Sequence, residues 1–292
     1  MNLTIFKDAD GFLGIAQPWL EAREAENNLL LGIALLLRKD PNRYRSEPFL
    51  GVITEAGSLV NVAVMTPPHN LVLAGLPQAA SLNSLAVGLI DRGWAIPGVT
   101  GPKETSRLFA QLWSRLTGAG VQAGIRMRLY ELTRVIQPTR PPGYLYEAKK
   151  DEISLIVDWI VAFQQEALNV KIEREDAIRQ AERLVSECNL YLWDDGRPVS
   201  MAASARPTRN GISVNLVYTP PEQRRKGYAS ACVAALSQRL LEAGYKFCCL
   251  FTDLDNPTSN RIYMEVGYQP VCDHEEHRFV EVTTVSSSGG SG

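Results

Sequence analysis

The chain has 292 residues, which is long enough for two domains of ordinary size, each with a substantial core. Its 30 basic and 32 acidic residues give a formal charge of −2, and this balance argues against a nucleic-acid-binding protein, which needs a basic face to displace counterions. The longest apolar block, residues 29–37, is too short to cross a bilayer and lies beyond the position of a signal peptide. We therefore expect a cytoplasmic protein that binds neither nucleic acid nor membrane, whereas the oligomeric state cannot be inferred.

The first 137 residues alternate between strand and helix periodicities. In chain order, the patterns predict a strand over 3–6, one or two helices over 19–38, strands over 49–53, 59–65 and 71–76, a helix over 79–92, a short segment over 95–100, a helix over 104–117 and a strand over 124–135. A proline-rich stretch, residues 138–143, follows and predicts a linker, because proline denies helices and strands a hydrogen bond. We place domains at 1–137 and 150–284, with a linker at 138–149 and a flexible tail at 285–292.

The most informative segment lies in the second domain, where an apolar strand ending at Val217, Tyr218 and Thr219 leads into a basic turn. The turn and the start of the helix that follows it contain Arg224, Arg225, Lys226, Gly227, Tyr228, Ala229 and Ser230. Backbone N–H groups at the start of a helix are unpaired and lie at the positive end of its dipole, so an anion can bind several of them together. Gly227 lets the main chain come close, and the basic side chains attract phosphate.

Two further elements follow the turn in the order of a strand–helix repeat. Apolar residues at helical spacing predict a helix from Ala229 to a C-terminal cap at Gly244. The apolar run 247–252, which contains the adjacent Cys248 and Cys249, predicts a buried strand parallel to the strand before the turn. None of the five cysteines has the spacing of a metal site or a disulfide framework, so we expect reduced core residues.

The spacing Arg224-x-x-Gly227-x-Ala229 resembles the acyl-CoA-binding signature of the GNAT family of N-acetyltransferases, in which Gln or Arg precedes Gly-x-Gly/Ala. By itself, such a turn also occurs at ordinary helix starts. The resemblance extends to the next predicted helix, which matches a second family pattern at four positions: Asn256, Tyr263, Gly267 and Tyr268. It covers residues 150–282 and implies acetyl-CoA as co-substrate, with no metal.

The resemblance also implies a fold of mixed α/β (α+β) type, in which a mixed central sheet is flanked by helices. The order of elements in the first half repeats in the second, so we predict two tandem GNAT-like domains. The first copy is degenerate, because residues 76–83 stand where the phosphate turn belongs and contain neither a basic cluster nor a glycine in the turn.

The family resemblance assigns roles to several residues. Val217, Tyr218 and Thr219 would offer backbone groups to pantetheine, and a main-chain N–H there could polarise the thioester oxygen. Tyr263 is the candidate general acid, because a tyrosine hydroxyl is protonated at neutral pH and can donate to a departing thiolate. Its alternative role is packing in the core. Asn256 would order the strand-to-helix loop or contact the pantetheine arm, and simple N-capping is its alternative.

The general base is not evident, because no glutamate stands in the stretch that leads to Asn256. Possible substitutes are Asp253, Glu222, His274 and His277. Structural interpretations compete with each of them: Asp253 and Asp255 as loop carboxylates, Glu222 as a solvated turn residue, and the two histidines as part of a polar hairpin loop rather than a metal site.

Together these features predict an N-acetyltransferase that moves an acetyl group from acetyl-CoA to a small-molecule or peptide amine in a ternary complex. A covalent route would need a serine or cysteine beside a base, and the sequence has no such recognisable pair. Two alternatives remain open. One is a non-catalytic acyl-CoA sensor, and the other is an S-acyltransferase that loads a carrier thiol.

Overall fold

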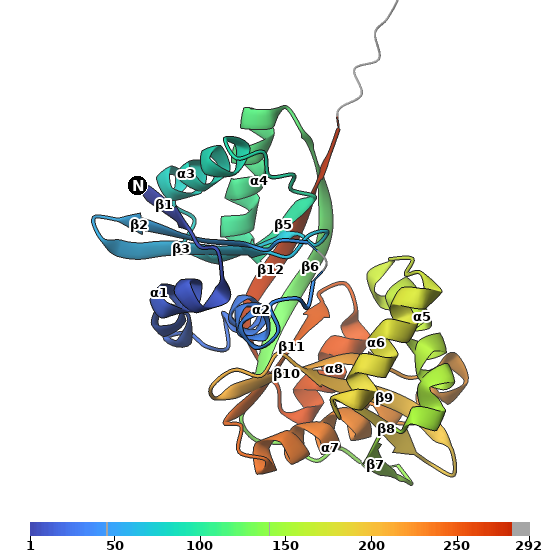
Figure 1. The fold of residues 1–292 in the computed structure, drawn as a ribbon. Helices are drawn as coiled ribbons and strands as arrows, with labels where there is room; N and C mark the ends of the chain where they lie inside the picture. The colour runs from blue at the N-terminus through green and yellow to red at the C-terminus, as the bar shows by residue number, and fades with distance from the viewer. Residues whose placement is uncertain (45, 140, 282–292) are drawn as a thin grey trace, which may run out of the picture. The chain divides into compact units, whose positions relative to one another are not determined.

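The computed structural model describes residues 1–44, 46–139 and 141–281, and the tail predicted at 285–292 lies outside these ranges (Figure 1). The chain divides into two compact units, each built from separate segments. Unit 1 contains residues 1–16 and 40–125 together with the chain from residue 274 onward, and unit 2 contains residues 17–39 and 126–273. The predicted domain boundaries at 137 and 150 divide the sequence into two continuous halves. These units are not continuous in sequence, so the predicted boundaries stay a prediction.

Unit 1 is a mixed sheet with two helices packed on its apolar face. Its strands follow the order β1 (Asn2–Ile5), β2 (Phe49–Glu55), β3 (Ser58–Met65), β4 (Leu71–Gly75), β5 (Gly98–Pro102) and the C-terminal part of β12 (Gln269–Val280). Strands β4 and β5 are parallel, and the other neighbours are antiparallel. The core gathers Phe49, Met65, Leu85, Phe109 and Trp113 from the strands and from α3 (Ala79–Ile90) and α4 (Lys103–Thr117).

Unit 2 has the same kind of sheet. Its strands follow the order β7 (Tyr144–Glu147), β8 (Leu190–Asp194), β9 (Pro198–Ala205), β10 (Gly211–Tyr218), β11 (Phe247–Asp253) and the C-terminal part of β6 (Gly120–Leu132). Strands β10 and β11 are parallel, as the sequence predicted, and the other pairs within the unit are antiparallel.

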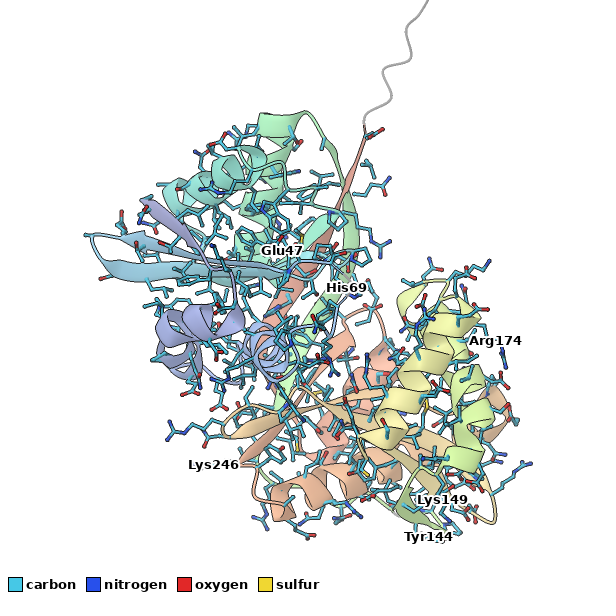
Figure 2. All side chains as sticks on the ribbon, viewed as in Figure 1. Glu47, His69, Tyr144, Lys149, Arg174 and Lys246 are labelled. Atoms are coloured by element: carbon cyan, nitrogen blue, oxygen red, sulfur yellow. The ribbon has the colours of Figure 1, made fainter. Side chains whose placement is uncertain are left out.

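Helices cover both faces of this second sheet. On one face, α7 (Tyr228–Glu242) and α8 (Pro257–Val266) share a core with the strands that includes Val214, Leu236 and Leu250. On the other face, α5 (Ile153–Leu168) and α6 (Arg174–Ser186) pack on β8, β9 and β10. Arg174, labelled in Figure 2, begins α6 and pairs with Asp158 of α5 at 2.9 Å. The helix α2 (Asn28–Lys39) also contacts β10.

Both halves of the chain pass through one order of elements: strand, two helices, three strands, helix, strand, helix, strand. This confirms the repeat that the sequence predicted. The last strand of each half, however, completes the sheet that the other half begins. Strand β6, from the first half, pairs with β11 in unit 2, and β12, from the second half, pairs with β5 in unit 1. We call this arrangement the strand exchange.

Three sequence predictions need correction. The first helix, α1 (Ala9–Glu21), begins ten residues before the predicted start at 19; Gly11, Gly14 and Pro18 hid its pattern, and the carboxylate of Asp8 accepts from the amide of Gly11 at 2.8 Å. A strand, β7, lies inside the predicted linker. It pairs with β8, and Tyr144 and Lys149 mark this edge of unit 2 (Figure 2).

The third correction concerns His274 and His277, which belong to β12 and not to a hairpin loop. His274 lies opposite Pro102 and His277 opposite Val99 in β5. The dense charge of this segment suggested a turn, but its charges are paired with side chains of neighbouring elements. For example, Arg107 holds both carboxylate oxygens of Glu275 at 2.9 and 3.1 Å. No helix among the described residues is long and apolar enough to cross a membrane.

Candidate functional site

Strand β10 separates from β11 shortly before the basic turn. The parallel pairing joins only Gly211–Ser213 to Phe247–Cys249. Beyond it, the register between β10 and β9 shifts between Asn215 and Tyr218, and Leu216 has a positive φ of 49°. A bulge of this kind turns a strand and leaves its edge unpaired. The edge of β10 that faces β11 is therefore open from residue 214 to the end of the strand.

The three strand residues predicted to bind pantetheine lie at this open edge, and two of their carbonyls have partners in the protein. The hydroxyl of Ser200 donates to the carbonyl of Tyr218 at 3.1 Å, and Nε of Arg224 donates to the carbonyl of Thr219 at 2.9 Å. Neither the amide nor the carbonyl of Val217 is bonded across to β11. The backbone of residue 217 therefore lies at an edge that an extended ligand can pair with.

The turn that follows has the conformation of an anion cradle. Arg225 and Gly227 have positive φ values of 63° and 83°, and Gly227 is the residue immediately before α7. The amides of residues 225–230 donate no hydrogen bond to another described residue. Several N–H groups therefore remain available at the positive end of the helix dipole, as the sequence predicted.

The three basic side chains of the turn differ in their contacts. Arg224 forms an ion pair with Glu166 of α5, and its guanidinium lies 5.8 Å from the ring centroid of Tyr218. Lys226 donates to the side chain of Gln223 at 3.0 Å. Arg225 is exposed and has no ion pair with another described residue. Glu166 also accepts from the Tyr218 hydroxyl at 3.1 Å, so this carboxylate links α5, β10 and the turn.

The first turn of α7 is anchored in the core of unit 2. Tyr228 is buried and donates its hydroxyl to Asp195, and Ser230 is buried beside it. Ala229 is half-buried. Of these predicted cofactor-binding residues, Tyr228 and Ser230 can therefore offer their backbone amides, while the side chain of Tyr228 fixes the helix.

Tyr263 lies in α8 with 8% of its surface exposed, within the core that α7 and α8 share with the strands. Its ring is edge-on to Tyr268, with centroids 6.0 Å apart. Burial raises the pKa of Tyr263 well above the ordinary value for a tyrosine, so the hydroxyl keeps its proton throughout the neutral range. The position suits the packing role, and the protonation state is the one that an acid requires.

Asn256 caps α8, which is the simpler of its two predicted roles. Its side-chain oxygen accepts from the amide of Ser259 at 3.0 Å. Sequence reasoning missed its neighbour Asn260, which is placed more centrally. Asn260 donates to the carbonyls of Asp253 and Asn256, both at 2.8 Å, and accepts from the hydroxyl of Tyr130 at 2.9 Å. The only signal for this role was a second asparagine one helical turn after the cap.

The predicted substitutes for the base have mostly structural contacts. Asp253 accepts from the amide of Asp255 at 2.9 Å, and Asp255 pairs with Arg126 at 2.6 Å, so both hold the loop after β11. Glu222 is exposed in a short 3₁₀ turn, Pro221–Gln223. His274 and His277 belong to the part of β12 that lies in unit 1. The structure thus favours the loop and turn interpretations of the three carboxylates.

Comparison with known families settles what kind of domain carries this turn. Residues 153–268 match the model of the Acetyltransferase (GNAT) family. This segment is a GNAT domain. Family membership supports acyl transfer as its type of chemistry, and it agrees with the resemblance seen in the sequence. No curated protein sequence matches the chain.

Solved structures extend the likeness over both halves of the chain. A Drosophila protein is 12% identical, with 95% of this chain and 98% of that chain covered and a TM-score of 0.67. A GNAT-family acetyltransferase from Colwellia psychrerythraea is 11% identical, with 96% and 100% covered and a TM-score of 0.57. A tandem GNAT protein from the clavulanic acid biosynthesis pathway is 11% identical, with 97% and 99% covered and a TM-score of 0.55. At these identities the likeness is one of fold, and it includes a tandem arrangement.

Proposed function

We propose that unit 2 transfers an acetyl group from acetyl-CoA to an amine acceptor by direct attack in a ternary complex. The observation that carries this proposal is the opening of β10 away from β11 immediately before a basic turn with unpaired amides. An open strand edge suits the amide-bearing pantetheine arm, and the turn suits a diphosphate. Acetyl-CoA has both groups in this order along its length.

The contacts of Arg224 indicate how the diphosphate would enter. Its ion pair with Glu166 is solvent-exposed, and an exposed ion pair stabilises the protein by at most about 1 kcal/mol. A phosphate could therefore replace the carboxylate at little cost and gain a charge-assisted hydrogen bond. Arg225, with no ionic partner among the described residues, adds a second positive charge at the same turn.

Transfer would then proceed without an acyl-enzyme. The lone pair of a neutral amine attacks the thioester carbon, a C–N bond forms, and the C–S bond breaks. The departing thiolate takes the proton of the Tyr263 hydroxyl, which burial keeps in its protonated form. Each cycle converts an ammonium and acetyl-CoA into an amide, free CoA and one released proton.

Replacing Tyr263 with Phe tests the catalytic role against the sensor alternative. We expect turnover to fall by about 10²–10⁴-fold, the range typical of a lost general acid, while CoA affinity measured by calorimetry stays unchanged. Tyr245→Phe, at a partly buried tyrosine of the same unit, is the matched control and should retain activity. Absence of turnover by the unmodified protein with every amine offered, despite CoA binding, would favour the sensor. Acetylation of a carrier protein's thiol in preference to amines would favour the S-acyltransferase.

A further inference from the structure

A row of side chains crosses three neighbouring strands of unit 2 at the point where β10 and β11 part. Ser213 of β10 lies opposite Cys249 of β11, and Cys249 lies opposite Glu131 of β6. Residues in register on neighbouring strands point to the same face of a sheet. The hydroxyl of Ser213 lies 3.3 Å from the sulfur of Cys249, as this alignment requires. Ser213 and Cys249 form the last pair before the gap.

Glu131 points to the face opposite Tyr263. Its neighbours in β6, Tyr130 and Leu132, lie in the core that contains Tyr263, and side chains alternate between faces along a strand. A thioester held in the gap between β10 and β11 would therefore have the tyrosine on one side and the row of Glu131 on the other. Only β11 lies between the strand that carries Glu131 and this gap, and neighbouring strands in a sheet lie about 5 Å apart.

The same face contains buried polar atoms with no protein partner. The side-chain oxygen of Asn28, at the start of α2, accepts from the hydroxyl of Ser213 at 2.7 Å, and both residues are fully buried. The Nδ2 atom of Asn28 and the Oδ1 atom of Asn215 are buried and make no hydrogen bond to a described residue. Asn215 follows Ser213 by two residues in β10, on the same face. Buried polar atoms are normally paired, so two unpaired ones here indicate a polar ligand.

Glu131 supplies the carboxylate of this row of side chains. It is half-buried and forms no ion pair or hydrogen bond with another described residue, and burial raises its pKa. Two other charged groups, Arg206 and Glu24, act on Cys249 as Glu131 does. Glu24 is already occupied, because it accepts from the backbone amide and the side chain of Asn210 at 2.7 and 2.6 Å.

We propose that Glu131, with the free side-chain oxygen of Asn215, forms the binding site for the acceptor's ammonium group, and that Glu131 is the catalytic base. This inference rests on the proposed acetyl transfer and supplies the base that the sequence did not reveal. Glu131 takes one proton from the bound ammonium, which leaves the amine lone pair free to attack the thioester carbon. After the C–S bond breaks and the thiolate takes the proton of Tyr263, the protonated amide nitrogen returns a proton to that tyrosine, and Glu131 releases its own to solvent.

The test compares Glu131→Gln with Glu242→Gln, an exposed glutamate near the end of α7, in the full chain. The probes are acetyl-CoA and three amines: butylamine, lysine amide and a short peptide with a free N-terminus. Turnover of each amine is measured from pH 6 to pH 10, and amine binding is measured by calorimetry in the presence of CoA. We expect Glu131→Gln to keep CoA affinity, to lose about 10²-fold or more in turnover at pH 7, and to recover part of it at high pH, where the amine loses its proton unaided. Glu131→Asp should restore part of the rate, and Glu242→Gln should match the unmodified protein.

The outcomes separate the two proposals. If the protein acetylates amines and Glu131→Gln leaves the pH profile and the KM for the amine unchanged, the site is wrong while the function stands. If the unmodified protein transfers no acetyl group but binds an amine that Glu131→Gln no longer binds, the function is wrong and the ammonium site stands. If the unmodified protein neither acetylates nor binds any of these amines, both proposals fail.

Discussion

Gly227 and Gly244 flank α7 and form a natural pair for testing the turn. Both have positive φ, 83° and 107°, a region that costs a residue with a side chain about 1–2 kcal/mol. A Cβ atom at Gly244 would meet nothing within 4 Å, and one at Gly227 would meet only ordinary contacts at 3.8 and 3.9 Å. A side chain at either glycine would therefore cause similar backbone strain, but only Gly227 lies in the basic turn.

Gly227→Ala should weaken CoA binding by roughly tenfold or more, equivalent to about 1.4 kcal/mol, because a shifted turn misdirects the amides at the head of α7. Gly244→Ala should cost similar stability and leave CoA affinity unchanged. Calorimetric titration of CoA into both variants, together with their thermal midpoints, checks the prediction. Equal losses of affinity in the two variants would contradict it.

Buried thiols make unit 2 sensitive to alkaline pH. Burial raises the pKa of Cys232 and Cys248 to about 12 and that of Cys249 to about 11, from an ordinary value of 9.0. As the pH rises above 9, the unfolded chain loses these protons first and is favoured. The stability that is present below pH 9 is therefore lost progressively between pH 9 and 12.

The thermal midpoint should accordingly fall as the pH is raised from 8 to 10.5. Cys248→Ala should make this fall less steep, although it lowers the midpoint at pH 8 by leaving a cavity. Cys188→Ala, at an exposed cysteine, should leave the slope unaltered. Scanning calorimetry across the pH series measures the slope, and identical slopes in all three proteins would refute this account.

At the scale of elements, the connection after β4 differs from the connection after β10. Only residues 76–78 separate β4 from α3, whereas residues 219–227 separate β10 from α7. Strands β3 and β4 remain in unbroken register from Asn61 to Val64, without a bulge. The side chain of Asn61 donates to the carbonyls of Ala74 and Leu76 at 3.2 and 3.1 Å, and Thr105 donates to the carbonyl of Gly75 at 2.8 Å. The strand end that would meet pantetheine is occupied by the protein itself.

We therefore expect one CoA molecule to bind per chain. Calorimetry should give a stoichiometry near one for the unmodified protein, and Gly227→Ala should weaken that single event rather than reveal a second site. A stoichiometry of two, or residual binding of normal affinity in the variant, would show that the closed turn of unit 1 also accepts the nucleotide.

Local signals predicted most of these elements correctly. Periodicity placed most strands of the first half and, in the second half, the strand before the basic turn and the strand over 247–252. Asn256 with Pro257 and Gly267 marked both ends of α8. The site was predictable where it depends on a local turn, as at Gly227. Glu131, Asn28 and Asn215 could not be found in this way, because they lie on one face of the sheet only when three segments distant in sequence come together. The charged run around His274 was wrongly predicted to be a hairpin loop for the same reason, since its partners lie in another part of the chain.

At the scale of the molecule, the strand exchange makes each unit depend on both halves of the sequence. A chain that stops at Asp273 keeps every residue of unit 2 but loses the strand that pairs with β5. Val99, fully buried in unit 1, would then lie on an uncovered edge strand.

Such a truncated chain should show faster amide hydrogen exchange in β5 than the full chain, while β11 stays protected. Hydrogen exchange measured by mass spectrometry distinguishes the two strands. A chain that stops at Val280 serves as the control, since it retains the pairing of β12 with β5. Unchanged exchange in β5 after the longer truncation would show that β12 contributes little to unit 1.

The strand exchange also bears on how such a gene can change over time. A duplicate that no longer serves its original purpose is usually free to decay or to be deleted. Here the loss of the first half would remove β6, and with it Glu131, from the unit that contains the basic turn. Mutation can therefore reshape the first copy but cannot discard it, and the two halves are inherited as one.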